Sequence, residues 1–166
     1  MKYFAFLILA FVLSCNSNPQ KQILAKDSTR MIIVDQGDKE MDAAIARGKL
    51  TLPNFDSALL SRNSNYTGFA IKVRFAYGEN NGEHIWLNEI QKVNEEYVGL
   101  VNNEPEYVTD LKLRDTIQIN KQDISDWMYF DDDILKGGFT IKLFRARMTP
   151  KERAEFDSGA NYKFEK

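Results

Sequence analysis

The sequence contains few of the residues that carry enzyme chemistry. Its 166 residues include one cysteine and one histidine. A lone thiol cannot form a disulfide within the chain, and a zinc site needs several converging cysteine, histidine or carboxylate ligands. We therefore expect no internal disulfide, no zinc or copper site and no cofactor. Serines are plentiful, but none lies in the Gly-x-Ser-x-Gly turn that presents a catalytic serine.

The sequence also lacks a hydrophobic run of membrane-spanning length and any run of basic residues. The uncharged segment Tyr3–Leu13 has eleven residues. As a helix it would be about 16 Å long, roughly half of a hydrocarbon core, and this length is typical of a signal peptide. Lys and Arg number 22 against 24 Asp and Glu, and the two signs alternate along the chain. This balance disfavours nucleic acid as a partner.

The residues that are present at the N-terminus predict export and lipidation. Lys2 supplies a positive charge before the apolar run. Val12–Cys15 then resembles the lipobox, at which bacterial lipoproteins are acylated on cysteine and cleaved just before it. We predict a signal peptide over residues 1–14, a lipidated cysteine and flexible tether over 15–37, and a folded domain over 38–166. The alternative is an ordinary secretory signal with an incidental cysteine.

Lipidation of Cys15 would define where the protein lies. Two or three acyl chains, at about 0.8 kcal/mol per buried CH₂, hold a protein firmly at a membrane. Asn16 follows the cysteine, in place of the aspartate that retains lipoproteins in the inner membrane of enteric bacteria. We therefore expect a lipid-anchored protein of the bacterial cell envelope, on the outer membrane and facing the periplasm. The expected partners are the membrane, through the anchor, and an envelope protein or a cell-wall fragment.

The pattern of residues 38–166 predicts an α+β domain with a β-hairpin near its centre. Apolar residues alternate with polar or small ones from Phe69 to Tyr77, as in a half-buried strand. Asn81-Gly82 favours a type I′ turn, so a second strand is expected over 84–92. In that register Tyr77 would face Trp86.

Further patterns complete the expected architecture. Strands are predicted over 97–101 and 116–119. Helices are predicted after Asp38, with Gly48 at the end, and after Pro53. Two more are expected over 138–148, where a strand is the alternative, and from the capping residue Thr149. Together these elements predict a small antiparallel sheet of four or five strands, open or curled into a half-barrel, packed with three or four helices.

Four ordered motifs resemble one bacterial family. They are Glu83–Trp86, Gly99–Pro105, Ile124–Tyr129 and Gly137–Ile141. In this order they are similar to the YegJ-like domain, over Met41 to about Phe156. Arg114-Asp115 departs from the Gly-Asp that is usual in the family, so the turn there is expected to differ. The resemblance implies no activity, because none is established for the family.

The candidate functional residues fall within the same motifs. We assign a candidate binding surface to a set of polar and aromatic side chains: Glu83, His84, Trp86, Asn102, Asn103, Asp126, Trp127 and Tyr129. His84 is the only side chain with an ordinary pKa near neutrality. Each residue also has a structural interpretation, such as a turn hydrogen bond for His84 and core packing for Trp127.

These residues leave three hypotheses open. The first is a non-enzymatic binding module, with an inhibitor or immunity-type protein as a variant. The second is a hydrolase that uses His84 as general base with Glu83 or Asp126 assisting. The third is a structural accessory lipoprotein. The sequence supplies no complete catalytic constellation, so we favour the binding module.

Overall fold

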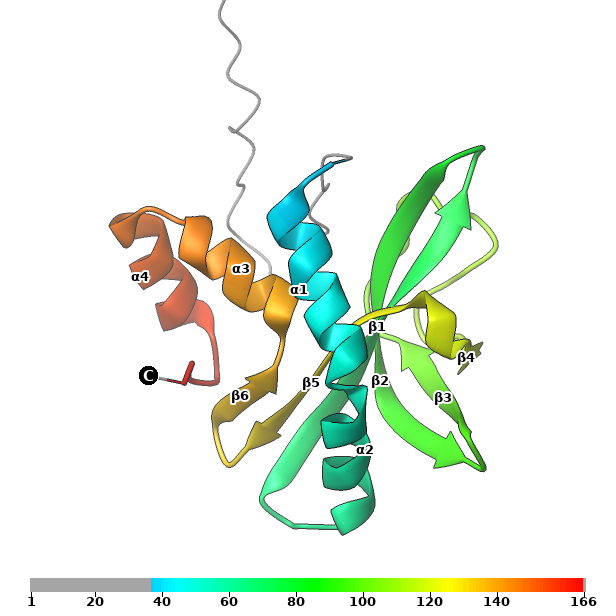
Figure 1. Cartoon of the computed structure of the whole chain (residues 1–166), viewed down its shortest axis with the longest axis horizontal. Coiled ribbons are helices and arrows are strands. Elements are labelled where there is room, and N and C mark those ends of the chain that lie inside the picture. Colours follow the sequence, from blue (N-terminus) through cyan, green and yellow to red (C-terminus); the bar gives the residue numbers. More distant parts are fainter. Residues whose placement is uncertain (1–36, 166) are drawn as a thin grey trace, which may run out of the picture.

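The computed structural model describes residues 37–165. The predicted signal peptide, Cys15 and almost all of the tether therefore lie outside the described residues. The described part forms one six-stranded sheet with four α-helices and one short 3₁₀ helix (Figure 1). The elements in chain order are α1 (Lys39–Leu50), α2 (Leu52–Ser61), β1 (Tyr66–Tyr77), β2 (Asn81–Val93), β3 (Glu96–Val101), β4 (Thr116–Ile119), η1 (Lys121–Asp123), β5 (Ile124–Asp131), β6 (Ile134–Gly137), α3 (Phe139–Arg147) and α4 (Pro150–Gly159).

The sheet confirms the α+β class and exceeds the predicted strand number. Its strand order is β4-β3-β2-β1-β5-β6, every neighbouring pair is antiparallel, and β4 and β6 form its two edges. The sheet does not close on itself. The two strands that the sequence did not predict are β5 and β6. Strand β5 contains Asp126, and a carboxylate is uncommon inside a strand.

The hairpin forms, but its predicted register is wrong. Arg74 pairs with His84 and Tyr77 pairs with Asn81. The turn therefore lies at residues 78–80, before the Asn-Gly pair, and Gly78 takes its left-handed backbone, with φ 58°. The new register differs from the predicted one by an odd number of residues. Tyr77 and Trp86 consequently lie on opposite faces of the sheet.

Helix starts follow the local signals closely. Asp38 caps α1 through hydrogen bonds from the backbone N–H groups of Glu40 and Met41. Thr149 and Glu152 form the expected capping box of α4. The ambiguous segment 138–148 is helical, as predicted, over Phe139–Arg147.

Gly48 does not end α1, contrary to the prediction, since the helix continues to Leu50. A Cβ at this position would lie 3.1 Å from Ser125 O and 3.2 Å from Asp126 Cα. This part of β5 has no strand partner on the side away from β1, because β6 pairs only with Met128–Asp131. Glycine thus lets α1 approach the free edge of β5, where an unpaired strand would otherwise be open to other chains.

The main core lies on one face of the sheet, with α2 packed against β1 and β5 there. Phe55 of α2 is fully buried and makes ring contacts with Phe69, Tyr97 and Trp127. Burial of such large rings supplies much of the stability of a small domain. The opposite face of the sheet is less completely covered, since Arg74 is exposed and His84 and Trp86 are half-buried there.

Candidate functional site

Strand alternation divides the central strands into two different faces. We call the first the Trp86 face, defined by the side chains of Lys72, Arg74, His84, Trp86 and Asp126. These residues share a face because Lys72 pairs with both Trp86 and Asp126, and Arg74 pairs with His84. We call the opposite side the Trp127 face, which carries the main core.

The structure separates the eight candidate residues between these faces. His84, Trp86 and Asp126 lie together on the Trp86 face. The residues on the Trp127 face or in its covering loop are Glu83, Asn103, Trp127 and Tyr129. Asn102 lies at the rim of the Trp86 face. The single binding surface predicted from the sequence is therefore two surfaces.

Glu83 has a structural contact set on the Trp127 face. Its carboxylate is 2% exposed and accepts hydrogen bonds from the backbone N–H groups of Glu106, Tyr107 and Val108, at 2.7, 2.9 and 2.9 Å. These bonds fix the loop between β3 and β4 across the end of the hairpin, where the rings of Tyr77 and Tyr107 stack. Glu83 therefore points away from its neighbour His84.

Trp127 and Tyr129 also belong to the core side. Trp127 is 4% exposed, and its indole N–H donates to Gly48 O at 3.0 Å. Its ring contacts Phe55 and Phe139 and stacks on Tyr129. The indole thus joins α1, α2 and α3 to β5, in agreement with its structural interpretation.

The two asparagines extend the sheet beyond β3. Asn103 is 8% exposed, and its side-chain oxygen accepts from the backbone N–H of Trp86 at 2.9 Å. The backbone N–H of Asn102 donates to Trp86 O at 2.9 Å. The side-chain oxygen of Asn102 also accepts a hydrogen bond from the side-chain N–H of Asn88 at 2.8 Å. The side-chain oxygen of Asn88 is buried and has no hydrogen-bond partner in the described part of the chain. Only Asn102 is exposed enough to meet a ligand.

Asp126 lies beneath the Trp86 face and organises the start of α3. Its carboxylate accepts from the backbone N–H of Trp127, Phe139 and Thr140 and from the Thr140 hydroxyl, at distances from 2.7 to 3.2 Å. Gly138, the capping residue of α3, has no side chain for this task. Burial raises the pKa of Asp126, and the hydrogen bonds from Thr140 oppose that shift. With its oxygens occupied, Asp126 has a structural role.

Lys72 is the cation nearest to this carboxylate. Its ammonium donates to Thr140 Oγ1 at 3.3 Å and lies 5.4 Å from the centre of the Trp86 ring. The Thr140 hydroxyl therefore connects Lys72 with Asp126. Burial lowers the pKa of Lys72 below its usual range, and the Asp126 charge acts in the opposite direction.

His84 is paired with a serine that the sequence analysis did not single out. Its Nδ1 lies 2.9 Å from Ser125 Oγ, and this hydroxyl also donates to Lys72 O at 3.2 Å. Burial, together with the charges of Lys72, Arg74 and Lys49, lowers the pKa of His84 to about 4. The imidazole is therefore neutral at pH 7.

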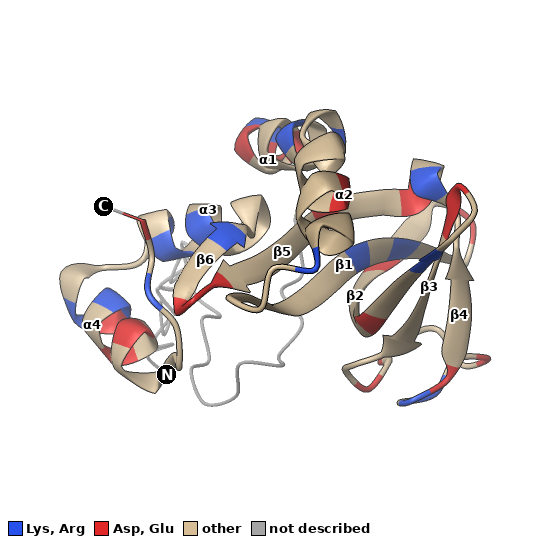
Figure 2. Cartoon of the chain, turned by 90° about the horizontal axis from the view of Figure 1, so that it is seen from below, with Lys and Arg blue, Asp and Glu red and all other residues tan. Residues whose placement is uncertain are grey.

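Positive charge around His84 exceeds the negative charge that could balance it. Within residues 37–165, no carboxylate oxygen lies within 4 Å of the charged nitrogens of Lys49, Lys72 or Arg74. Lys49 and Arg74 instead donate to backbone carbonyls, those of Gln122 and Asn81. Figure 2 shows the basic residues of β1 as blue bands, with no acidic band on that strand. The alternation of Lys72 and Arg74 with apolar residues was the signal that could have identified them.

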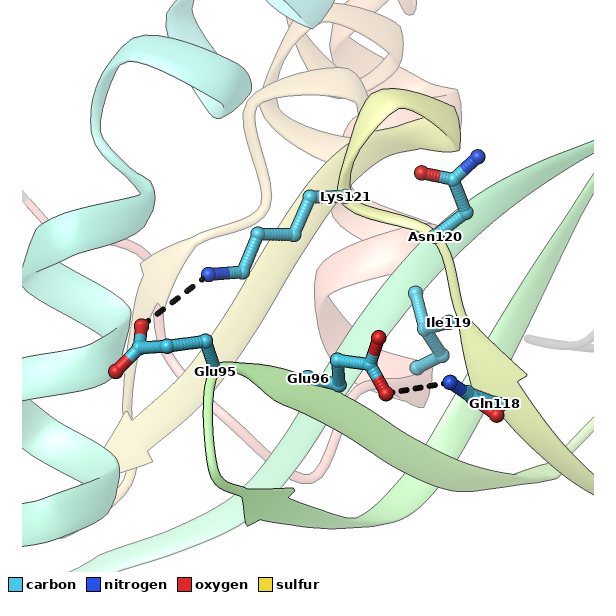
Figure 3. Close-up of a pocket in the computed structure, with 6 residues that line it drawn as sticks. All are labelled: Glu95, Glu96, Gln118, Ile119, Asn120 and Lys121. Atoms are coloured by element: carbon cyan, nitrogen blue, oxygen red, sulfur yellow. Dashed lines mark hydrogen bonds and ion pairs between the residues drawn. The ribbon is translucent and has the colours of Figure 1, made fainter.

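A hollow of the described surface is at a different place. It has a volume of about 600 Å³ and is lined by Glu95, Glu96, Gln118, Ile119, Asn120 and Lys121 (Figure 3). Its polar side chains pair with one another, Glu95 with Lys121 and Glu96 with Gln118. None of the eight candidate residues lines this hollow.

No helix between residues 37 and 165 is both long enough and apolar enough to cross a bilayer. Over the same residues, no three His, Cys, Asp or Glu side chains are grouped in a way that could hold a metal ion.

Comparisons with known proteins agree with the motif resemblance. The family model described as "Uncharacterized protein conserved in bacteria (DUF2314)" matches residues 38–164. A protein of Neisseria meningitidis serogroup B named "Putative ankyrin repeat protein" is 33% identical over 132 residues, which are 75% of this chain and 52% of that protein. The "Uncharacterized protein YegJ" of Escherichia coli K12 is 38% identical over 73 residues, 44% of this chain and 47% of that protein.

The chain spans about half the length of the curated relatives that it matches. No solved structure matches it. The YegJ-like resemblance is nevertheless confirmed, because the family model covers nearly the whole described domain. The chain belongs to the bacterial DUF2314 family.

Proposed function

We propose that this chain is a bacterial envelope lipoprotein whose α+β domain is a non-enzymatic binding module, with the Trp86 face as its binding surface. The observation that carries the proposal is the set of side chains on that face. A half-buried indole and a neutral imidazole lie beside Lys72 and Arg74, for which no carboxylate partner lies within 4 Å in the described part of the chain. Aromatic and arginine side chains beside polar groups are typical of protein interfaces.

We infer that the partner is a protein. One relative is named an ankyrin repeat protein, and stacked ankyrin repeats provide extended surfaces for binding. The hollow of Figure 3 holds none of the candidate residues, so a small molecule held there would not explain them. A cell-wall fragment on the Trp86 face is the alternative ligand.

Site-specific photo-crosslinking in the native host tests the binding surface. A crosslinking residue at Ala76, which is exposed on the Trp86 face, should form one discrete product. The same residue at Lys112, in the loop that covers the Trp127 face, should not. The Ala76 product should disappear when Trp86→Ala is added. Equal products from both positions, or a product indifferent to Trp86, would contradict the proposed surface.

The hydrolase alternative is supported by the 2.9 Å contact between His84 and Ser125. Three observations weigh against it. Ser125 is only 2% exposed, and the two carboxylates expected to assist, Glu83 and Asp126, are occupied by other donors and do not contact His84. A fluorophosphonate probe should therefore leave Ser125 unmodified. Labelling that is lost in both Ser125→Ala and His84→Gln would establish the hydrolase instead.

The lipid anchor is tested separately. Cells grown with labelled palmitate should incorporate label into the wild-type chain and not into Cys15→Ser, and the variant should leave the membrane fraction. Ser28→Thr, in the predicted tether and outside the lipobox, serves as the control. Incorporation of label into Cys15→Ser would place the acyl chain elsewhere.

A further inference from the structure

We infer that the Trp86 face binds an acidic segment of a protein partner, with carboxylates received by Lys49, Lys72 and Arg74 around His84. This inference rests on the proposed function and names the chemistry of the partner. The whole chain has a net charge of −2, yet His84 lies near three cations, Lys72 and Arg74 of the Trp86 face and Lys49 of α1, while the face has one carboxylate, Asp126. A local excess of positive charge on a protein of net negative charge attracts acidic ligands and orients them.

The single carboxylate of the face is already used. Asp126 accepts four hydrogen bonds, and Lys72 reaches it only through the Thr140 hydroxyl. Asp126 therefore acts on Lys72 through its charge, but it forms no ion pair within 4 Å with Lys49, Lys72 or Arg74. Some basic residues of the described chain have close acidic partners, as Arg145 has in Asp157 at 2.6 Å and Arg147 in Asp38 at 2.6 Å. Others, such as Arg62 and Lys112, have no carboxylate of the described chain within 4 Å, so what distinguishes the Trp86 face is that its unpaired cations lie close together around His84. Lys49 and Arg74 are exposed and have no carboxylate partner among residues 37–165, so they are available to a ligand, whereas the half-buried Lys72 adds its charge from below.

The cations come from separate elements and surround the imidazole. Lys72 and Arg74 belong to β1, and Lys49 belongs to the last turn of α1. Arg74 lies across β2 above Gly82, where any Cβ would approach its guanidinium to within 2.7 Å. Glycine at this position thus makes room for the arginine. A guanidinium is well suited to bidentate binding of a carboxylate.

The remaining residues favour an extended peptide over a small anion. Trp86 and Asn102 continue the face along β2 beyond the cations and offer an aromatic surface and an exposed amide. A small anion would need only the cations. A peptide with carboxylates next to apolar side chains would use both parts of the face, as expected from the mixed composition of protein interfaces.

Because His84 is the only histidine, it reports directly on this site. The full chain is prepared without a polyhistidine tag, and its imidazole resonances are followed by NMR during titration with hexaglutamate at low salt. Bound carboxylates should raise the pKa of His84, since they oppose the charges that lower it. Saturable shifts of His84 and of the Trp86 indole are expected, and 0.5 M salt should weaken binding at least tenfold.

Substitutions of single cations test whether their charge, and not a change of the fold, controls binding of hexaglutamate. Lys72→Met and Arg74→Met should each weaken hexaglutamate binding about tenfold or more, whereas the exposed control Lys112→Met should bind as the wild type does. Circular dichroism of each variant shows that the fold is intact. Equal binding by all three variants would overturn the inference.

Further ligands distinguish this inference from the broader proposal. Hexalysine and a hexamer of serine and glycine should cause no shift. If the neutral hexamer shifted Trp86 as strongly as hexaglutamate, the face would still be a binding surface but the acidic partner would be wrong. Tighter binding of muramyl dipeptide than of hexaglutamate would likewise replace the acidic protein segment by a cell-wall fragment.

Discussion

Glu83 and His84 are neighbours in β2, yet they lie in different environments. Glu83 is buried on the Trp127 face, where three backbone N–H groups saturate its carboxylate. His84 lies half-buried on the Trp86 face, with one hydroxyl partner and an excess of positive charge nearby. The two tryptophans differ in the same way, since Trp127 is core and Trp86 is half-buried beside Lys72.

This comparison shows how one sequence motif can serve two purposes. Adjacent residues of a strand point to opposite faces, so Glu83 can hold the fold while His84 remains available. On the Trp127 face the polar atoms are satisfied within the chain. On the Trp86 face cations remain without carboxylate partners, which is the expected state of a surface that binds something else.

The largest expected difference is between the tryptophans. Trp127→Ala should lower the free energy of unfolding by about 3–5 kcal/mol, because it opens a cavity next to Phe55 and removes the bond to Gly48 O. Trp86→Ala should cost about 1 kcal/mol, because its ring is partly exposed. Urea denaturation followed by circular dichroism measures both. Equal losses would show that the Trp86 face is also core.

Glu83→Gln should have the next largest effect. An amide offers one acceptor oxygen in place of two, so N–H groups of the covering loop lose their partner inside the fold. We expect a loss of about 2–3 kcal/mol, together with faster proteolysis within residues 102–115. Glu79→Gln, at an exposed turn position of the same hairpin, is the matched control and should be neutral. A neutral Glu83→Gln would mean that the loop is held by other contacts.

His84 should make stability depend on pH. Its pKa falls from 6.5 in the unfolded chain to about 4 in the folded protein, so between these values the unfolded state binds more protons. Stability should therefore decrease as pH falls from 6.5 to 4, by on the order of 2 kcal/mol for this group. Unfolding curves at pH 7 and pH 4.5 for wild type and His84→Gln isolate the contribution. An undiminished pH dependence in His84→Gln would assign the effect to other groups.

The smallest effect is expected for Lys72→Met. The thioether side chain keeps the apolar contact with Trp86 and removes a charge that burial disfavours. Unfolding free energy should stay within about 1 kcal/mol of wild type. A loss above 2 kcal/mol in urea denaturation would indicate that Lys72 serves the fold through Thr140 and Asp126, and would reduce the contrast between the two faces.

Much of the fold could be predicted where the signals are local. The capping box at Thr149 and the Asp38 cap place two helix starts correctly, because each depends on hydrogen bonds within four residues. The strand Thr116–Ile119 is also correct to the residue. The motifs quoted for the YegJ-like resemblance identified the family, which the family model confirms.

The errors concern contacts between distant residues. The hairpin register depends on which side chains meet the core, and the turn at Gly78 overrode the Asn-Gly signal. Strand β5 was missed because Asp126 is compatible with a central strand only when the N-terminus of α3, thirteen or more residues later, supplies its donors. Ser125 was missed for the same reason, since its partner His84 is 41 residues away.

The sequence by itself determined the α+β class, the helix caps, the family and the chemical inventory of one histidine and one cysteine. The candidate residues could be named from their motifs, but their division between two faces was decided only in three dimensions. Strand register sets which neighbours share a face, and it placed Glu83 and Trp127 in the core while leaving His84 and Trp86 beside unpaired cations. The proposed role of the Trp86 face therefore depends on the tertiary structure. The excess of positive charge around His84 exists only when β1, α1 and β2 lie side by side.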